Sequence, residues 1–356
     1  MAFVIGRGCD EDIGDRPTGR LGRYRAADGS EGSKLYLDLD GPHSVLVVGK
    51  RGYGKSYTLG VVAEELARAR GVAPVVIDPM GAFGTLGEGE SIPSKVVDCP
   101  TVTPDSLDPK SWCSLLGISP ESGSGGLVWK AAQDESTLAE MKAAVRQTEA
   151  PKRDRRAAVN HLELAESWGV FDANGLDASA LASGEVTVLD LSGVDTAPAN
   201  AVCRAVAEAL YRARITDRID RLPWLLVDEA HTFFDGIADS ALRLLLTRGR
   251  APGVSLVCAT QRPSAVSAVA VSQSDILVSH RLTARDDVQS LAAARPTYLD
   301  TSLEERMPTE PGEVVIVDDA TESVHAGQIR PRETPHGGKS PRASLLSAQS
   351  SMAKDS

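Results

Sequence analysis

The sequence has few aromatic residues and no long apolar run. Aromatic residues make up 4% of its 356 residues and hydrophobic residues 42%, so we expect a core built mainly from Ala, Val and Leu. No apolar run approaches the ~18 residues that a membrane-spanning helix needs, and the N-terminus lacks a signal-peptide pattern. These absences predict a cytoplasmic protein with no membrane span.

Paired cysteines are also absent. Cys9, Cys99, Cys113, Cys203 and Cys258 are scattered singly, with no C-x-x-C pair. This spacing excludes the common zinc-binding patterns. We therefore expect free thiols, as is usual in a reducing cytoplasm.

Positive charge is scarce, and lysine especially so. The formal net charge is −11, with 10 Lys against 28 Arg and no Lys between positions 152 and 339. A high-salt cytoplasm and codon bias both explain this bias. The net charge argues against a wholly basic nucleic-acid-binding surface, although it leaves room for a local basic channel.

The strongest signal in the chain is a glycine-rich stretch. Residues 49–56 read GKRGYGKS and match the phosphate-loop pattern G-x-x-x-x-G-K-[ST] at every fixed position. An apolar run over 45–48 precedes the stretch and a helical pattern over 57–70 follows it. This is the strand–loop–helix context that the motif requires, so a glycine turn that binds nothing is the weaker alternative.

The residue types of this loop suit a nucleoside triphosphate. Glycines let the chain curl so that backbone N–H groups meet phosphate oxygens, and the start of a helix adds its dipole. We expect Lys55 to reach the β- and γ-phosphates of ATP and the Ser56 hydroxyl to bind Mg²⁺. The predicted nucleotide-binding residues are Gly49, Gly52, Tyr53, Gly54, Lys55, Ser56 and Tyr57.

A second apolar strand ends in two carboxylates. Residues 225–231 read LLVDEAH, and in phosphate-loop enzymes an acid at this place holds Mg²⁺. We assign Asp228 to the metal, together with Ser56, and Glu229 to polarising the attacking water. The alternative is a strand that simply ends in solvated acids.

A third strand, 254–260, delivers Thr260 and Gln261 to the same edge of the sheet. A polar side chain there is placed to sense the γ-phosphate and to help position water, and we expect Gln261 to do so. An ordinary exit from a strand into a loop is the alternative.

Arg248-Gly249-Arg250 ends a predicted helix. Arginine fingers neutralise charge on the transferred phosphoryl group, within one subunit or between two, and Arg250 is the better candidate. The alternative is a helix cap, because basic residues and glycine both favour that end of a helix.

Asp78 follows an apolar strand over 73–77 and is expected at the carboxyl edge of the sheet, where ligands bind. Support of the magnesium shell and formation of a turn are equally good explanations for it.

The remaining pattern predicts an α/β fold with a mainly parallel sheet. A short β-rich segment covers 1–40, the core covers 41–330, a helical insertion interrupts it over 101–175, and a disordered tail covers 331–356. Further strands are expected at 34–40, 185–191, 224–228, 276–282 and 312–318. Further helices are expected at 153–168, 199–215, 240–248 and 284–294.

These motifs together resemble the HerA/FtsK superfamily of DNA-pumping ATPases, most closely its HerA-like branch. The resemblance runs from His43 to Arg332. It rests on PHSVLVVGKRGYGKSY, VVIDPMG, VTVLDLSG, LLVDEAH, TRGRAPGVSLVCATQRPS and RPRETPHGGKSP, which follow in the family's order.

The resemblance implies a RecA-like phosphate-loop NTPase core with a helical insertion, assembled as a homo-hexameric ring that moves duplex DNA. It also implies that Glu229 is the catalytic glutamate, Gln261 the sensor and Arg250 the arginine that acts on a neighbouring subunit. The chain differs from many members in having Arg51-Gly52-Tyr53-Gly54 in its loop instead of Thr-Gly-Ser-Gly. We also expect it to lack the full N-terminal β-barrel of longer members, and with it the surface on which a nuclease partner would dock.

We therefore expect an ATP- and Mg²⁺-dependent DNA translocase or helicase. A viral or plasmid packaging or conjugation ATPase is an alternative within the same superfamily. An ATP-dependent assembly switch that responds to a protein partner and moves no nucleic acid is an alternative from another class. A small-molecule kinase is disfavoured, because it has no need of the Asp-Glu pair followed by Thr-Gln-Arg-Pro.

Overall fold

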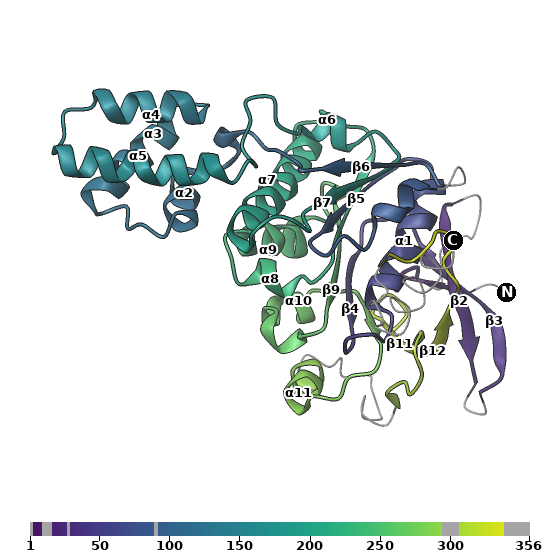
Figure 1. The fold of residues 1–356 in the computed structure, drawn as a ribbon. Coiled ribbons are helices and arrows are strands. Elements are labelled where there is room, and N and C mark those ends of the chain that lie inside the picture. The colour runs from purple at the N-terminus through teal and green to yellow at the C-terminus, as the bar shows by residue number, and fades with distance from the viewer. Residues whose placement is uncertain (1–2, 9–15, 27–28, 89–91, 294–305, 338–356) are drawn as a thin grey trace, which may run out of the picture.

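A computed structural model describes residues 3–8, 16–26, 29–88, 92–293 and 306–337 of the chain. Within these ranges one mixed, twelve-stranded sheet runs through the molecule in the order β1-β3-β2-β12-β11-β10-β4-β9-β8-β5-β7-β6. Helices cover both faces of the sheet, and a group of helices projects from one side (Figure 1). The α/β class predicted from the sequence is confirmed.

One half of the sheet, from β10 to β6, is parallel throughout. Its central strands are short and almost entirely apolar, as strands covered on both faces must be, and β5, β8 and β9 are buried along nearly their whole length. The strands are β4 (Ser44–Val48), β5 (Val72–Asp78), β6 (Ser94–Asp98), β7 (Val186–Asp190), β8 (Leu222–Val227), β9 (Ser255–Thr260) and β10 (Ile276–Ser279).

The other half is mainly antiparallel and joins both ends of the chain. Strand β11 (Glu313–Asp318) pairs with β10, β12 (Ser323–Ile329) pairs with β11, and β2 (Thr18–Arg25) pairs with β12. Strands β3 (Glu31–Asp38) and β1 (Phe3–Ile5) complete this side. The N-terminal strands therefore extend the central sheet through β12.

Alternate residues of the strands face two separate cores. Val45 and Val47 of β4 pack with α1 (Lys55–Arg68) in one core. Leu46 and Val48 pack in the other core, with α7 (Thr196–Ile215) and α9 (Asp239–Arg248). Shorter elements complete the domain: η1 (Gly84–Glu88), η2 (Pro104–Ser106), α6 (Ala178–Leu181), α8 (His231–Phe234), η3 (Pro263–Ala265), α10 (Ala268–Ser272) and α11 (Arg285–Ala293).

Between β6 and β7 the chain forms four helices with a core of their own. They are α2 (Pro109–Leu115), α3 (Gly123–Asp134), α4 (Leu138–Gln147) and α5 (Lys152–Ser167). Their first three N-termini are capped by side-chain oxygens of Asp108, Ser122 and Thr137, which satisfy N–H groups that a helix leaves unpaired. The apolar faces meet around the fully buried Trp112 and Leu162. These are the helices that project from the sheet in Figure 1.

Two further expectations concern single features. Cys99, Cys113, Cys203 and Cys258 are free thiols, and Cys9 lies outside the described residues. Among the helices that the structure describes, none combines the length and apolar character that crossing a membrane requires.

Candidate active site

The predicted site residues follow neighbouring parallel strands, so the fold brings most of them to one edge of the sheet. The phosphate loop follows β4, Asp78 ends β5, Asp228 follows β8, and Gln261 follows β9. The register pairs Val48 with Thr260 and Val227 with Cys258, so the strands end level with one another. This is the carboxyl edge, where open α/β sheets bind ligands.

The phosphate loop is a tight curl that depends on its glycines. Gly49, Gly52 and Gly54 have φ values of 155°, 83° and 111°, in the region where a side chain is strained. A Cβ built on Gly49 would lie 2.5 Å from the Cβ of His280. Helix α1 begins directly after the loop and no side chain caps it, so its first N–H groups are directed at the space where an anion binds.

His280 packs against the phosphate loop. The sequence motifs did not identify this residue. Its backbone N–H donates to the carbonyl of Val48 (2.8 Å), and the Lys50 N–H donates to the carbonyl of Arg281 (2.7 Å). Its Nε2 lies 2.9 Å from Oγ1 of Thr58 in the first turn of α1. Burial, with the nearby charge of Lys55, lowers the pKa of His280 to about 4, so the ring is neutral at pH 7.

Lys55 places a buried ammonium group between the loop and the two acids. The residue is only 5% exposed, and its Nζ donates to the carbonyl of Lys50 over 3.4 Å. Burial lowers the pKa of Lys55, while the charges of Glu229 and Asp228 act in the opposite direction. A desolvated cation in this place is suited to binding phosphate oxygens.

Asp228 is almost completely buried beside Ser56. Its Oδ1 accepts the N–H of Glu229 (2.9 Å), and its Oδ2 is buried without a hydrogen-bond partner among the described residues. Burial raises the pKa of Asp228 to about 6, which the approach of the Ser56 hydroxyl partly offsets. A buried carboxylate oxygen without a partner is costly, and a divalent cation beside it would relieve that cost.

The donor set at this position fits magnesium. Mg²⁺ is usually held by one or two protein oxygens, substrate phosphates and water, which Ser56 and Asp228 can provide beside the loop. No cluster of three or more His, Cys, Asp or Glu residues suited to a metal occurs in the part of the chain that the structure describes. Ser56 and Asp228 therefore provide only part of a magnesium site, and phosphate oxygens would complete it.

Glu229 projects from a strained backbone position. Its φ is 45°, which is uncommon for a residue other than glycine and tends to occur at functional sites. Its carboxylate lies near the backbone N–H of Gln261 and the charges of Lys55 and Arg51, which favour its charged form. Burial nevertheless raises its pKa. Its Oε2 is 3.4 Å from Nδ1 of His231, a contact without hydrogen-bond alignment.

Gln261 therefore lies with its backbone N–H near Glu229, and the neighbouring Thr260 contacts His231. Thr260 Oγ1 lies 3.3 Å from Nδ1 of His231 and accepts the N–H of Arg262 (3.0 Å). His231 was not predicted as a site residue. Burial, with the charges of Arg262 and Lys55, lowers its pKa, so it is neutral at pH 7.

Asp78 uses its carboxylate to hold a turn. It is fully buried and accepts N–H groups from Met80 (3.2 Å), Ala82 (3.0 Å) and Phe83 (2.8 Å). These bonds use both carboxylate oxygens. They favour the turn-forming explanation over support of a magnesium shell.

Arg250 lies at the opposite edge of the sheet from the loop. Its side chain is 76% exposed, and its Nη2 is 3.5 Å from Oδ2 of Asp275. Asp275 in turn accepts the N–H of Ser44, the first residue of β4 (2.7 Å). Helix α9 ends before it at Gly249, whose N–H donates to Leu245. Within one chain, Arg250 is therefore separated from Lys55 by the length of β4.

A cavity of about 680 Å³ opens beside the loop. It is lined by residues of the loop and by Glu229. Residues 311–312, 328–331 and 336–337 also line it. Tyr57 lines the cavity. Tyr53 does not; its carbonyl accepts the N–H of Gly312 (3.2 Å), and its ring lies 4.3 Å from Nζ of Lys50.

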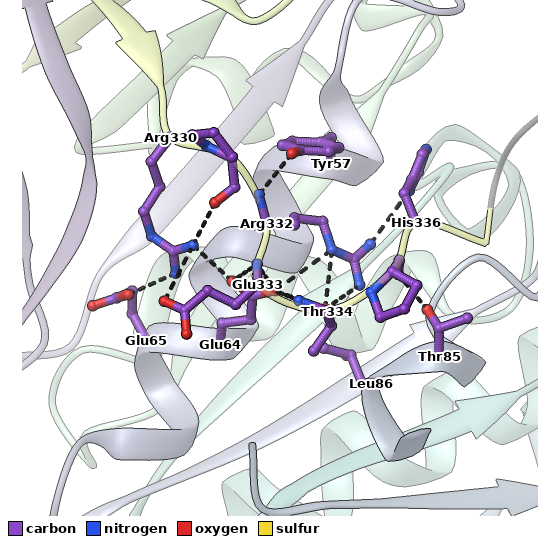
Figure 2. Close-up of polar contacts among 12 residues, drawn as sticks. Tyr57, Glu64, Glu65, Thr85, Leu86, Arg330, Arg332, Glu333, Thr334 and His336 are labelled. Atoms are coloured by element: carbon purple, nitrogen blue, oxygen red, sulfur yellow. Dashed lines mark hydrogen bonds and ion pairs between the residues drawn. The ribbon is translucent and has the colours of Figure 1, made fainter. Parts of the chain in front are cut away.

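The segment 330–336, part of which lines the cavity, lies along α1 (Figure 2). Thr334 Oγ1 and Arg330 Nη1 donate to the fully buried carboxylate of Glu64 (2.6 and 2.8 Å), and the Arg332 N–H donates to the Tyr57 hydroxyl (2.6 Å). The sequence predicts a disordered tail from 331; the described residues 331–337 lie beside α1, where Glu64 accepts the N–H groups of Glu333 and Thr334. Residues 338–356 lie outside the described residues.

The chain was also compared with known proteins. The family described as "Helicase HerA, central domain" matches residues 20–210, which include the loop, β5, the projecting helices and β7. No curated protein matches the chain.

Solved structures share the fold at low sequence identity. VirB4 of Thermoanaerobacter pseudethanolicus matches with a TM-score of 0.67 and 16% identity, over 88% of this chain and 97% of that one. The bacterial conjugative coupling protein TrwBdeltaN70 matches with a TM-score of 0.59 and 12% identity, over 94% and 97%. Both likenesses concern the fold.

Proposed function

The chain belongs to the family of the HerA helicase central domain, and from that premise we propose that it is an ATP-hydrolysing motor that moves duplex DNA. The observation that carries this proposal is the grouping of Lys55, Ser56, Asp228 and Glu229 around the phosphate loop, with Glu229 lining the same cavity. Each residue has a separate task in phosphoryl transfer.

Binding of the triphosphate is the task of the loop. Its backbone N–H groups and Lys55 neutralise phosphate oxygens, and Ser56 and Asp228 hold Mg²⁺. When bound, the metal neutralises charge on the phosphates and orients them. The buried Oδ2 of Asp228 has no hydrogen-bond partner among the described residues, so it is the protein oxygen best suited to bind the metal.

Activation of water is the task of Glu229. Its carboxylate lies near the Gln261 N–H and the charge of Lys55, and its raised pKa brings it closer to that of a useful general base. Gln261, which follows β9 at the same edge of the sheet, is our candidate for sensing the γ-phosphate. Positioning and charge neutralisation supply most of the rate in this class of reaction.

Completion of the site requires a second copy of the chain. Arg250 is exposed and lies at the edge of the sheet where β4 begins, so it does not reach the loop of its own chain. We infer that it enters the site of a neighbouring subunit in a homo-hexameric ring, as the family resemblance implies. The ring's central channel would hold the duplex through phosphate contacts, which weaken with salt.

The rate of ATP hydrolysis with and without duplex DNA, measured together with particle mass, tests the proposal. We expect Mg²⁺-dependent turnover that duplex DNA stimulates, in particles several times the mass of one chain. Turnover that ignores DNA but responds to a protein partner would replace the motor with an assembly switch. Stimulation by DNA that also needs a capsid or membrane partner would favour a packaging or conjugation ATPase.

A further inference from the structure

We propose that Asp275 and His43 are positioning residues for Arg250, whose guanidinium they hold at one place on the edge of the sheet where β4 begins. The inference rests on the proposed function, because Arg250 is the residue that is expected to enter the site of a neighbouring subunit. Neither positioning residue lies in the phosphate loop. Both act through the arginine and not on the nucleotide itself.

Arg250 has little support from its own helix. Helix α9 ends at Arg248, and Arg250 follows in a turn where its carbonyl accepts the N–H of Gly253 (3.2 Å). Its side chain is mostly exposed. An exposed arginine has many rotamers and loses conformational entropy when one of them is selected. An arginine that must reach a neighbouring site is more effective when a suitable rotamer is already favoured.

Asp275 provides the contact that favours one rotamer. It lies directly before β10, and its Oδ2 is 3.5 Å from Nη2 of Arg250. Its Oδ1 accepts the N–H of Ser44 (2.7 Å), which anchors the carboxylate to β4. An ion pair with one exposed partner contributes little to stability. Positioning of the arginine therefore explains this contact better than stabilisation of the fold does.

His43 holds the carboxylate of Asp275 from the buried side. Its Nδ1 lies 3.0 Å from Oδ2 of Asp275, and its Nε2 lies 3.1 Å from Oδ2 of Asp38. Both nitrogens of an imidazole donate only when the ring is protonated. Burial lowers the pKa of His43, but the hydrogen bonds and charges of the two carboxylates prevail and raise it to about 9. The ring is therefore charged at pH 7 and donates to both carboxylates.

The imidazole of His43 has little freedom to move. The backbone N–H of this residue donates to Oγ of Ser255 (3.0 Å), and its carbonyl accepts the N–H of Leu256 (2.9 Å), which ties it to β9. Its ring lies beside that of Trp224, with centroids 5.9 Å apart. A Cβ built on Gly6 would come within 2.7 Å of its Cε1. The donor beside the carboxylate is therefore fixed by the core.

Charges alternate from the interior to the surface in the order Arg7, Asp38, His43, Asp275 and Arg250, which we call the charge row. Arg7 donates through Nε to Oδ1 of Asp38 (2.9 Å), and both residues are buried, as His43 is. Buried charges persist in proteins where they are paired. Each carboxylate of the row lies between two cations, so the row presents a negative group of fixed position to the arginine.

Mixed assemblies test the inference, because they separate the chain that supplies the arginine from the chain that supplies the loop. Lys55→Ala subunits supply Arg250, and Arg250→Ala subunits supply an intact loop, so turnover in the mixture comes from interfaces between the two. Asp275→Asn is then placed in one partner at a time. Asparagine keeps an oxygen for the Ser44 N–H and removes the charge. The measurement is the rate of ATP hydrolysis at saturating ATP and a fixed mixing ratio.

In the arginine-supplying chain, Asp275→Asn should lower the turnover of the mixture about tenfold, since a misplacement of about 1 Å costs up to ~10²-fold. In the loop-supplying chain it should leave turnover unchanged, because Arg250 is absent there. His43→Gln should show the same difference between the two placements. The matched control is Asp239→Asn in the arginine-supplying chain, because Asp239 pairs with Arg243 of α9 (2.7 Å) and lies outside the charge row. It should leave turnover unchanged.

An equal loss in both placements would assign Asp275 to holding β4 and its loop, and would overturn the inference. No loss in either placement, or the same loss with Asp239→Asn, would overturn it as well. Equal effects of His43→Gln in both placements would remove His43 from the positioning role. A mixture without turnover, from an unmodified chain that hydrolyses ATP, would overturn the inference and the intersubunit role of Arg250 but leave the ATPase standing. An unmodified chain without turnover would overturn the proposed function as well.

Discussion

Arg250 and Asp275 contact each other, Nη2 to Oδ2 at 3.5 Å, at the edge of the sheet where β4 begins. The same oxygen of Asp275 lies 3.0 Å from Nδ1 of His43, and its other oxygen accepts the N–H of Ser44. The Arg250 guanidinium therefore contacts the carboxylate of Asp275, which His43 and the N–H of Ser44 hold in place. The arginine side chain is 76% exposed.

We predict that Arg250→Ala subunits, inactive alone, regain turnover when they are mixed with Lys55→Ala subunits. Each mixed interface can then combine an intact loop from one chain with an intact arginine from the other. The measurement is the ATP hydrolysis rate across mixing ratios at constant total protein, with each variant alone as the control. A rate that stays at background at every ratio would assign Arg250 to capping α9 instead.

We predict that Glu229→Gln keeps ATP affinity but lowers turnover by about 10²–10⁴-fold, the usual contribution of a general base. Glutamine preserves the shape at this strained position and removes the charge that polarises water. Nucleotide binding and steady-state hydrolysis should be measured on the same preparation. Turnover above about a tenth of the unmodified rate is incompatible with the ~10²-fold minimum and would move the role to another residue.

We predict that Gly49→Ala destabilises the chain by about 1–3 kcal/mol, the typical cost of overpacking, and weakens ATP binding. The new methyl group would collide with the Cβ of His280 at 2.5 Å. Gly84→Ala is the matched control, because a Cβ at Gly84 meets nothing within 4 Å. Chemical denaturation measures both. Equal stability of the two variants would mean that the loop does not rest on His280 as described.

We predict that the free energy of unfolding falls as pH rises from about 6.5 to about 9, through His43. Burial alone lowers the pKa of this imidazole, but hydrogen bonds and charges of Asp275 and Asp38 prevail and raise it to about 9. The folded chain then binds a proton that the unfolded chain has already released, since a free histidine has a pKa of ~6.5. The stabilisation is complete below pH ~6.5 and is lost as pH passes the folded value.

Denaturation curves at several pH values check this, with His43→Gln as the comparison. The variant carries no titrating ring, so its stability should change less over that interval. The expected difference is up to about 3 kcal/mol, from the cost of one pKa unit. Curves that fall with the same slope in both proteins would assign the pH dependence to other groups.

The candidate site residues that the sequence predicted are those that lie next to one another in the sequence. The loop residues 49–56 are adjacent, and so are Asp228 and Glu229. A run of buried apolar residues before each motif indicates a parallel strand and therefore a common edge. The strands β5, β7 and β8 were predicted to within a few residues for the same reason.

Other parts depend on partners far away in sequence, which no local pattern reveals. His280 contacts Thr58 across 222 positions, and Arg330 contacts Glu64 across 266. Strands β2 and β12 are rich in glycine and polar residues, because much of their surface stays accessible. Their places in the sheet come from pairing with each other.

The two chain segments that connect the projecting helices α2–α5 to the sheet lie side by side. There Val102 donates to the carbonyl of Val170 (2.9 Å) and accepts the N–H of Asp172 (3.1 Å). The two stems are hydrogen-bonded to each other, so a change in the length of the chain between them would leave the order of the strands as it is. Asp108 before α2 also pairs with Arg204 of α7 at 2.7 Å, so a change in the bundle would reach the ATPase core through this ion pair.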